Sequence, residues 1–411
     1  MNKTALTKTY TKDIQNSCLN SKKIVLSLAA ISFSASCTHA TLTPEIETYE
    51  EANRHAKARS GLRSESSNNN KTISSLQNST QTVSNTGNTL VIESSGTITI
   101  SNGGQQAVNF QPNSLTSTFL NKGTLIGGNN AASVRLGANT NNGVTIETFD
   151  NQGIIGNGSS KFGVTVFFGG GGKDSSKSII SNFSNSGTIH SNAGESIYFG
   201  NAKISSFVNS GTIKSKQGAG VNISQGTSIG NFNNTGTIEG KRMGVNVRST
   251  INTFVNDGLI TTTKGVHWSD GIQINANVKT LKNTGTIQGF SAPIRSSGGT
   301  IESLINEGTM KGESIGIYMS GGLVKTLINS GTINQNNSET WAAGIKLQNN
   351  STIENIINTG SIRSNAFGIS VTGGKFGTLT IKDGGMVYGK YSAIGVGRSQ
   401  TLGDLYIDGR S

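Results

Sequence analysis

The 411-residue chain contains 55 Gly, 3 Pro and 2 Cys, and only 14% of its residues are charged. Collagen is excluded, because it needs glycine at every third position and abundant proline. A typical disordered tail, which needs a high net charge, is excluded as well. With 33% hydrophobic residues, the composition indicates a β-rich chain with many tight turns and a thin, repetitive core.

The net charge of +12 does not indicate a nucleic-acid-binding protein. Residues 1–40 contribute +4 of this charge, and the other basic residues are scattered along the chain. A nucleic-acid-binding protein concentrates its basic residues on one face. We therefore expect no nucleic-acid partner.

The N-terminus has the pattern of an export signal. A pair of lysines precedes residues 24–35, which are uncharged and largely apolar, and small residues follow. This segment is too short to span a membrane, which takes about 20 residues, and its pattern is that of a secretory signal. We expect residues 1–40 to be a signal peptide that is cleaved after Ala40. The residues ending at Cys37 also partly match a lipoprotein box, so lipidation of Cys37 is the alternative.

Residues 41–83 are predicted to form a short helix and a polar linker. Thr43 suits the N-cap of a helix and Pro44 its first position, and Gly61 can end it. The Ser, Asn and Gln residues that follow indicate a flexible joint. Both cysteines precede residue 41, so the exported chain would have none, which suits passage across a second membrane in the unfolded state.

Residues 84–411 repeat one motif: an apolar pair, Asn, any residue, Gly, Thr and Ile. The motif glycine recurs about every 26 residues, and periods of 20–50 residues indicate solenoids or related repeat folds. Asn and Gly tolerate positive φ best, so each Asn-x-Gly is predicted to form a corner at positive φ. Examples are Asn209 with Gly211, Asn234 with Gly236, and Asn329 with Gly331.

The aligned repeats also predict which side chains stack. Four residues before the motif glycine stands a large apolar residue, and an aliphatic residue stands two residues after it. The motif therefore predicts one strand before its Asn-x-Gly and one after it. Another alternating strand lies between successive motifs, so each repeat holds three short strands. We predict an all-β chain: a right-handed parallel β-helix of about 12 coils, preceded by the signal peptide and the short helix. Equivalent residues would stack about 4.8 Å apart. The predicted core ladder includes Phe183, Phe207, Phe232 and Phe254.

The export signal, the cysteine-free chain and the Asn-x-Gly-Thr-Ile coils together resemble the passenger region of autotransporters. The likeness is to Campylobacter-type autotransporter adhesins, and more distantly to vacuolating-cytotoxin-like passengers. The resemblance implies a membrane β-barrel after the passenger, whereas the sequence ends at Ser411 within the repeat. We therefore expect a fragment, a truncated gene product, or a passenger whose outer-membrane barrel is encoded separately.

The resemblance implies an exported, non-catalytic adhesin, at the cell surface, in the outer membrane or outside the cell. Its partner would be a ligand on host cells or other surfaces. Trp268 and Trp341 are the candidate contact residues, because both lie in loops longer than their neighbours and tryptophan in a protruding loop often makes contacts. The alternative is that each tryptophan covers its own loop.

The sequence predicts no catalytic residue, metal site or cofactor. The G-x-S-x-G match at 226–230 is expected about once by chance in a chain so rich in Gly and Ser, and no helix is predicted after it. The main competing hypothesis is a β-helix hydrolase or lyase acting on glycans, which needs clustered carboxylates. From Glu65 onward no two acidic residues are adjacent in the sequence. A toxin-like passenger and a non-functional truncated fragment are the remaining alternatives.

Overall fold

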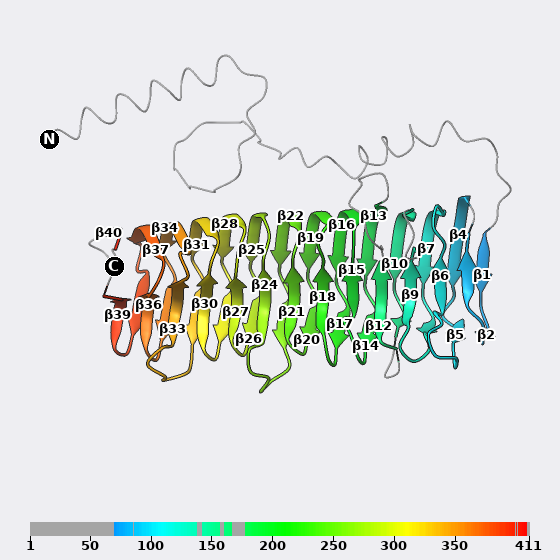
Figure 1. Ribbon diagram of the computed structural model, residues 1–411, viewed down its shortest axis with the longest axis horizontal. Coiled ribbons are helices and arrows are strands. Elements are labelled where there is room, and N and C mark those ends of the chain that lie inside the picture. Colours follow the sequence, from blue (N-terminus) through cyan, green and yellow to red (C-terminus); the bar gives the residue numbers. More distant parts are fainter. Residues whose placement is uncertain are drawn as a thin grey trace, which may run out of the picture. The chain divides into compact units, whose positions relative to one another are not determined.

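Three parallel sheets run along the β-helix (Figure 1). The computed structural model describes residues 70–408, apart from 85, 138–141, 157–159, 167–176, 399 and 401. The predicted signal peptide, its cleavage site at Ala40, the alternative lipidation site at Cys37 and the helix from Thr43 lie outside the described residues. Among those described, no helix is long and apolar enough to cross a membrane.

The chain visits the three sheets in turn, so each coil contributes one strand to each sheet. Sheet A consists of β1 (Lys71–Ile73), β4 (Thr86–Ile92), β7 (Leu115–Asn121), β10 (Thr145–Asn151), β13 (Ser178–Asn185), β16 (Ala202–Asn209), β19 (Ser228–Asn234), β22 (Thr250–Asn256), β25 (Val278–Asn283), β28 (Thr300–Asn306), β31 (Leu323–Asn329), β34 (Thr352–Asn358), β37 (Lys375–Ile381) and β40 (Asp404–Ile407). Sheet B consists of β2 (Leu76–Gln77), β5 (Thr97–Thr99), β8 (Thr124–Ile126), β11 (Ile154–Ile155), β14 (Thr188–Ser191), β17 (Thr212–Ser215), β20 (Thr237–Gly240), β23 (Leu259–Thr262), β26 (Thr286–Gly289), β29 (Thr309–Gly312), β32 (Thr332–Gln335), β35 (Ser361–Ser364) and β38 (Met386–Gly389). Sheet C consists of β3 (Gln81–Val83), β6 (Val108–Phe110), β9 (Ala132–Leu136), β12 (Phe162–Val166), β15 (Ile197–Phe199), β18 (Ala219–Ile223), β21 (Met243–Val247), β24 (Asp270–Ile274), β27 (Ala292–Ser296), β30 (Ile315–Ser320), β33 (Ala343–Gln348), β36 (Phe367–Val371) and β39 (Ser392–Val396).

The predicted parallel β-helix of about 12 coils is confirmed, and one further coil lies at its N-terminal end. The described part of the chain gives 14 strands in sheet A and 13 in each of the other sheets. The extra coil, β1 to β3, occupies residues 71–83, so the interpretation of these residues as a polar linker was wrong. Its strands are only two or three residues long, and few of its residues are apolar. Ile73 and Val83 are buried, and polar Gln81 is buried with them and accepts a hydrogen bond from Lys71 Nζ at 2.6 Å.

Stacked aromatic rings fill the core behind sheet A. The ring centroids of Phe183 and Phe207 lie 5.2 Å apart, those of Phe207 and Phe232 4.4 Å, and those of Phe232 and Phe254 4.3 Å. The planes are nearly parallel and all four rings are buried. In the next coil Leu281 takes the same position. Each aromatic pair adds about 0.5–1.5 kcal/mol beyond the burial of its surface.

A ladder of asparagines runs along the corner between sheets A and B. Asn209 Nδ2 donates to Asn234 Oδ1 at 2.7 Å, and Asn329 Nδ2 donates to Asn358 Oδ1 at the same distance. Every amide except that of Asn306 also donates to the carbonyl of the motif glycine in its own turn, as Asn209 does to Gly211 at 3.3 Å. These side chains are fully buried, and a buried amide is tolerated because its hydrogen bonds are satisfied. The complete ladder is Asn121, Asn151, Asn185, Asn209, Asn234, Asn256, Asn283, Asn306, Asn329 and Asn358.

The motif glycines are required for a different reason than predicted. Gly211, Gly236 and Gly331 do not have positive φ, and neither do the asparagines two residues before them. The prediction of a positive-φ corner was therefore wrong. At each glycine a Cβ would collide with the carbonyl oxygen of the motif glycine in the preceding coil, which is Gly187 for Gly211. The close stacking of coils, rather than a left-handed turn, excludes every side chain there.

Candidate functional site

Both tryptophans of the chain line one groove on the outer face of sheet C. Trp268 lies in the loop between β23 and β24, and Trp341 in the loop between β32 and β33. The two residues are 79% and 45% exposed. The loops are three coils apart, which is about 14 Å at 4.8 Å per coil. The structure thus brings the two predicted contact residues to the two ends of a single groove, whose volume is about 590 Å³.

Loop length explains why a groove forms at this place. The loops 263–269 and 336–342 each contain seven residues, whereas the two turns between them, 290–291 and 313–314, contain two each. The long loops therefore form walls, and the short turns leave a floor between them. Both long loops project beyond the neighbouring turns at the lower edge of Figure 1.

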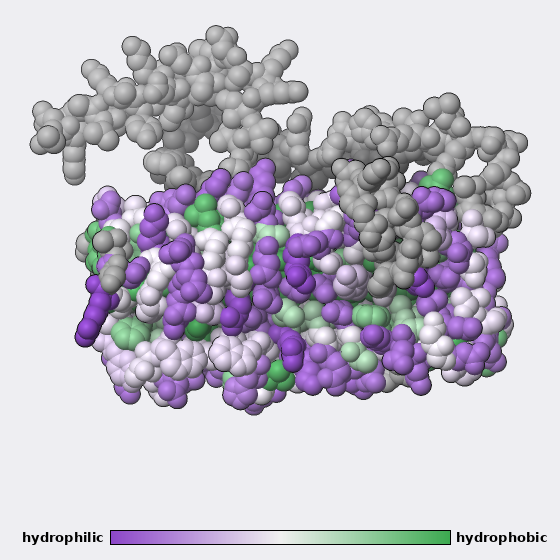
Figure 2. Space-filling model, in the orientation of Figure 1, coloured by the Kyte–Doolittle hydropathy of each residue, from purple (hydrophilic) through white to green (hydrophobic). Residues whose placement is uncertain are grey.

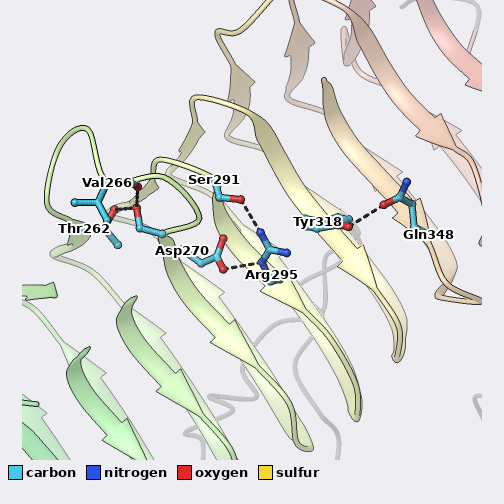
Figure 3. A network of polar contacts seen from close by, with 8 residues as sticks. Thr262, Val266, Asp270, Ser291, Arg295, Tyr318 and Gln348 are labelled. Atoms are coloured by element: carbon cyan, nitrogen blue, oxygen red, sulfur yellow. Dashed lines mark hydrogen bonds and ion pairs between the residues drawn. The ribbon is translucent and has the colours of Figure 1, made fainter. Parts of the chain in front are cut away.

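The backbone of the first wall holds Trp268 outward. Trp268 has a φ of +59°, a conformation that bulky side chains rarely adopt and that costs of order 1–3 kcal/mol. The loop around it is closed by a hydrogen bond between the hydroxyls of Thr262 and Ser269 at 3.1 Å, and by one from Ser269 Oγ to the carbonyl of Val266 at 2.7 Å (Figure 3). His267 packs edge-on against Phe290 of the floor, with ring centroids 4.7 Å apart. Backbone strain of this kind clusters at ligand-binding and active sites, which makes Trp268 a candidate contact residue.

The second wall is fixed by a buried amide at its base. Gln335 Nε2 donates to the carbonyl of Asn337 at 2.6 Å and to that of Glu313 at 2.9 Å. The backbone amide of Glu339 donates to Asn337 Oδ1 at 3.0 Å. These bonds tie the loop that carries Trp341 to the coil before it.

A polar network crosses the floor of the groove, and Figure 3 shows its members. Arg295 Nε donates to Asp270 Oδ2 at 2.6 Å, and its Nη2 donates to Ser291 Oγ at 2.6 Å. The guanidinium lies 4.5 Å from the centroid of the Tyr318 ring, and the Tyr318 hydroxyl donates to Gln348 Oε1 at 2.8 Å. Burial raises the pKa of the Asp270 carboxyl, while Arg295 acts in the opposite direction.

Lys346 differs from Arg295 in having no carboxylate beside it. Its side chain is buried, and its Nζ donates to the carbonyl of Trp341 at 2.8 Å and lies 5.6 Å from the centroid of the Trp341 ring. Among the described residues no ion pair involves it. Burial lowers the pKa of its ammonium group, as expected for a cation removed from water.

The catalytic motifs weighed in the sequence find no support in the geometry. Ser228 of the G-x-S-x-G match is the first residue of β19 in sheet A, so the strand–turn–helix of a nucleophile elbow is missing there. Among the described residues, the one carboxylate that lines the groove is that of Glu339, and the nearby carboxylate of Asp270 is engaged by Arg295. Within the described ranges, no group of three His, Cys, Asp or Glu residues is placed to hold a metal ion.

The sequence identified the two tryptophans as candidate contact residues but gave no indication of the residues on the floor between their loops. Arg295, Tyr318 and Lys346 occupy the same register position in three successive coils. In the three coils directly before them that position holds Asn222, Asn246 and Gln273, although Arg135 and Tyr198 occupy it nearer the N-terminus. The change from small amides to large cationic and aromatic side chains, at the point where the loops lengthen, is the signal that could have identified them.

Comparison with protein-family models, with curated proteins and with solved structures finds no match to this chain.

Proposed function

We propose that this protein is an exported, non-catalytic adhesin-like passenger that contacts host cells or other surfaces through the groove between Trp268 and Trp341. The observation that carries the proposal is the convergence of both tryptophans on one groove. Trp268 is too exposed to serve as a cover for its own loop, and exposed tryptophans are frequent anchors of binding interfaces.

The rest of the surface and the repeat fit this role. The face drawn in Figure 2 is mainly hydrophilic, with hydrophobic side chains scattered over it, so a localised site is a better candidate for contact than a broad apolar surface. Export is proposed from the signal-like N-terminus and the absence of cysteine after residue 37. The stacked coils would hold the groove rigidly, which limits the entropy lost on binding.

The test is adhesion by bacteria that carry the chain. Adhesion to cultured cells is compared for three strains: one with the native protein, one without it, and one with the double variant Trp268→Ala and Trp341→Ala. The variant Tyr406→Ala is the control for loss of an exposed aromatic residue outside the groove. Antibody labelling of intact cells measures surface display. We expect equal display, with adhesion lost only in the double variant and in the strain without the protein. Full adhesion by the double variant would contradict the proposal, and so would a chain found only inside the cell.

A further inference from the structure

The aromatic faces in the groove disfavour a cationic ligand. Arg295 lies over the ring of Tyr318 and Lys346 over that of Trp341. Aromatic faces attract cations, and here the protein's own cations already occupy two of them. A positively charged ligand would be repelled by Lys346, which has no carboxylate paired with it among the described residues.

The charges on the floor favour an anion at one particular place. Arg295 is neutralised by Asp270, with which it forms an ion pair at 2.6 Å. Among the described residues Lys346 has one hydrogen-bond acceptor, the carbonyl of Trp341, although an ammonium group has three donors. A buried cation without a counter-charge is unfavourable, and a ligand carboxylate would supply both the missing charge and further acceptors.

The lining of the groove combines flat apolar surfaces with hydrogen-bonding groups. Trp268 and Trp341 offer indole rings, and Ser314, Asn337 and Glu339 offer hydroxyl, amide and carboxylate groups. A sugar ring has the same two aspects, with apolar C–H faces and hydroxyls around its edge. A peptide strand would require a free sheet edge, but the floor is the face of a sheet whose strands are already paired.

We propose that the groove binds an acidic oligosaccharide, with sugar rings against Trp268 and Trp341 and a carboxylate of the sugar chain at Lys346. Apolar contact requires atoms within about 4–4.5 Å, so one ring cannot reach both tryptophans across about 14 Å and several linked rings are needed. This inference rests on the proposed adhesive function and specifies the chemistry of its ligand.

Tryptophan fluorescence of the full chain tests the inference, because the only two tryptophans both lie in the groove. The protein is titrated with trigalacturonate, with its neutral methyl ester, and with a short glutamate peptide as a control for charge alone. We expect a saturable change with trigalacturonate, binding at least about tenfold weaker for the ester, as for the loss of a charged hydrogen bond, and no change with the peptide. Equal affinity for the ester would overturn the role of the carboxylate, and equal affinity for the peptide would overturn the role of the sugar.

Two substitutions locate the charge. Lys346→Met keeps a long side chain without the ammonium group and should remove the preference for the acidic sugar, whereas Lys346→Arg should retain it. Lys203→Met, at an exposed site on β16 of sheet A, is the matched control and should bind as the native chain does. If Lys346→Met keeps the preference, the inference is wrong. If no saccharide binds while adhesion still depends on the tryptophans, the inference fails and the proposed function stands.

Discussion

Replacing Asn234 by alanine cuts the asparagine ladder in its middle. Asn234 is fully buried, its Oδ1 accepts from Asn209 Nδ2 at 2.7 Å, and its Nδ2 donates to Asn256 Oδ1 at 2.8 Å. Without it, the buried Oδ1 of Asn256 has no donor, at a cost of about 1–3 kcal/mol. Asn209 Nδ2 keeps its bond to the carbonyl of Gly211 and loses about 0.5–1.5 kcal/mol. We expect Asn234→Ala to lower the free energy of unfolding by about 2–4 kcal/mol.

Asn121→Ala is the matched control at the end of the ladder. The coil before Asn121 has Ile92 at the equivalent position, and Asn121 Oδ1 has no hydrogen-bond partner among the described residues. The substitution therefore leaves one new unsatisfied group, on Asn151, and removes an existing one. We expect its cost to be smaller than that of Asn234→Ala by about 1 kcal/mol or more.

Urea unfolding measures both losses, and hydrogen exchange locates them. The amides of Thr235 and Gly236 donate to the carbonyl of Asn209, so their exchange should accelerate in Asn234→Ala, because local opening then needs less free energy. Two results would refute the idea that the ladder stabilises the coils. One is an equal decrease in the free energy of unfolding for the two variants, and the other is a decrease below about 1 kcal/mol for Asn234→Ala.

Three further substitutions test the packing of the coils and the charge in the groove. Gly211→Ala should destabilise by about 1–3 kcal/mol through overpacking, whereas Gly298→Ala, where a Cβ meets no atom within 4 Å, should change the melting temperature little. Phe207→Ala should cost about 3–5 kcal/mol in urea unfolding, and Phe207→Leu markedly less, because Leu281 already fills this position in a later coil. For Lys346, burial lowers the pKa in the folded chain, so the unfolded chain binds more protons. Stability relative to Lys346→Met should therefore rise as the pH increases through the lowered pKa towards 10.5, the ordinary pKa of lysine. A fall of stability as the pH approaches 10.5 would contradict the direction of the shift.

The repeat made the fold predictable, because its period fixes which residues share a register position. Phe207 and Asn209 could be assigned to stacks from spacing alone. The first coil could not, since a coil that buries little more than Ile73 and Val83 does not show the alternation. The reason for Gly211 was also hidden from local rules, because it depends on the backbone of the preceding coil rather than on φ.

The candidate site was predictable only in part. The sequence marked the tryptophans by the length of their loops, but whether Trp268 and Trp341 face one groove depends on how three coils stack. The roles of Arg295 and Lys346 depend on their burial and on whether a carboxylate lies nearby, and the spacing of residues within a single repeat predicts neither property. These two residues stand out only when the same register position is compared in successive coils.

Fluorine NMR of the full chain labelled with 5-fluorotryptophan tests the central claim most directly, because Trp268 and Trp341 give the only two signals. On titration with trigalacturonate, both signals should shift and saturate together with one dissociation constant, as expected for two ends of one binding groove. A shift of only one signal, two different dissociation constants, or no shift at either tryptophan would contradict the claim.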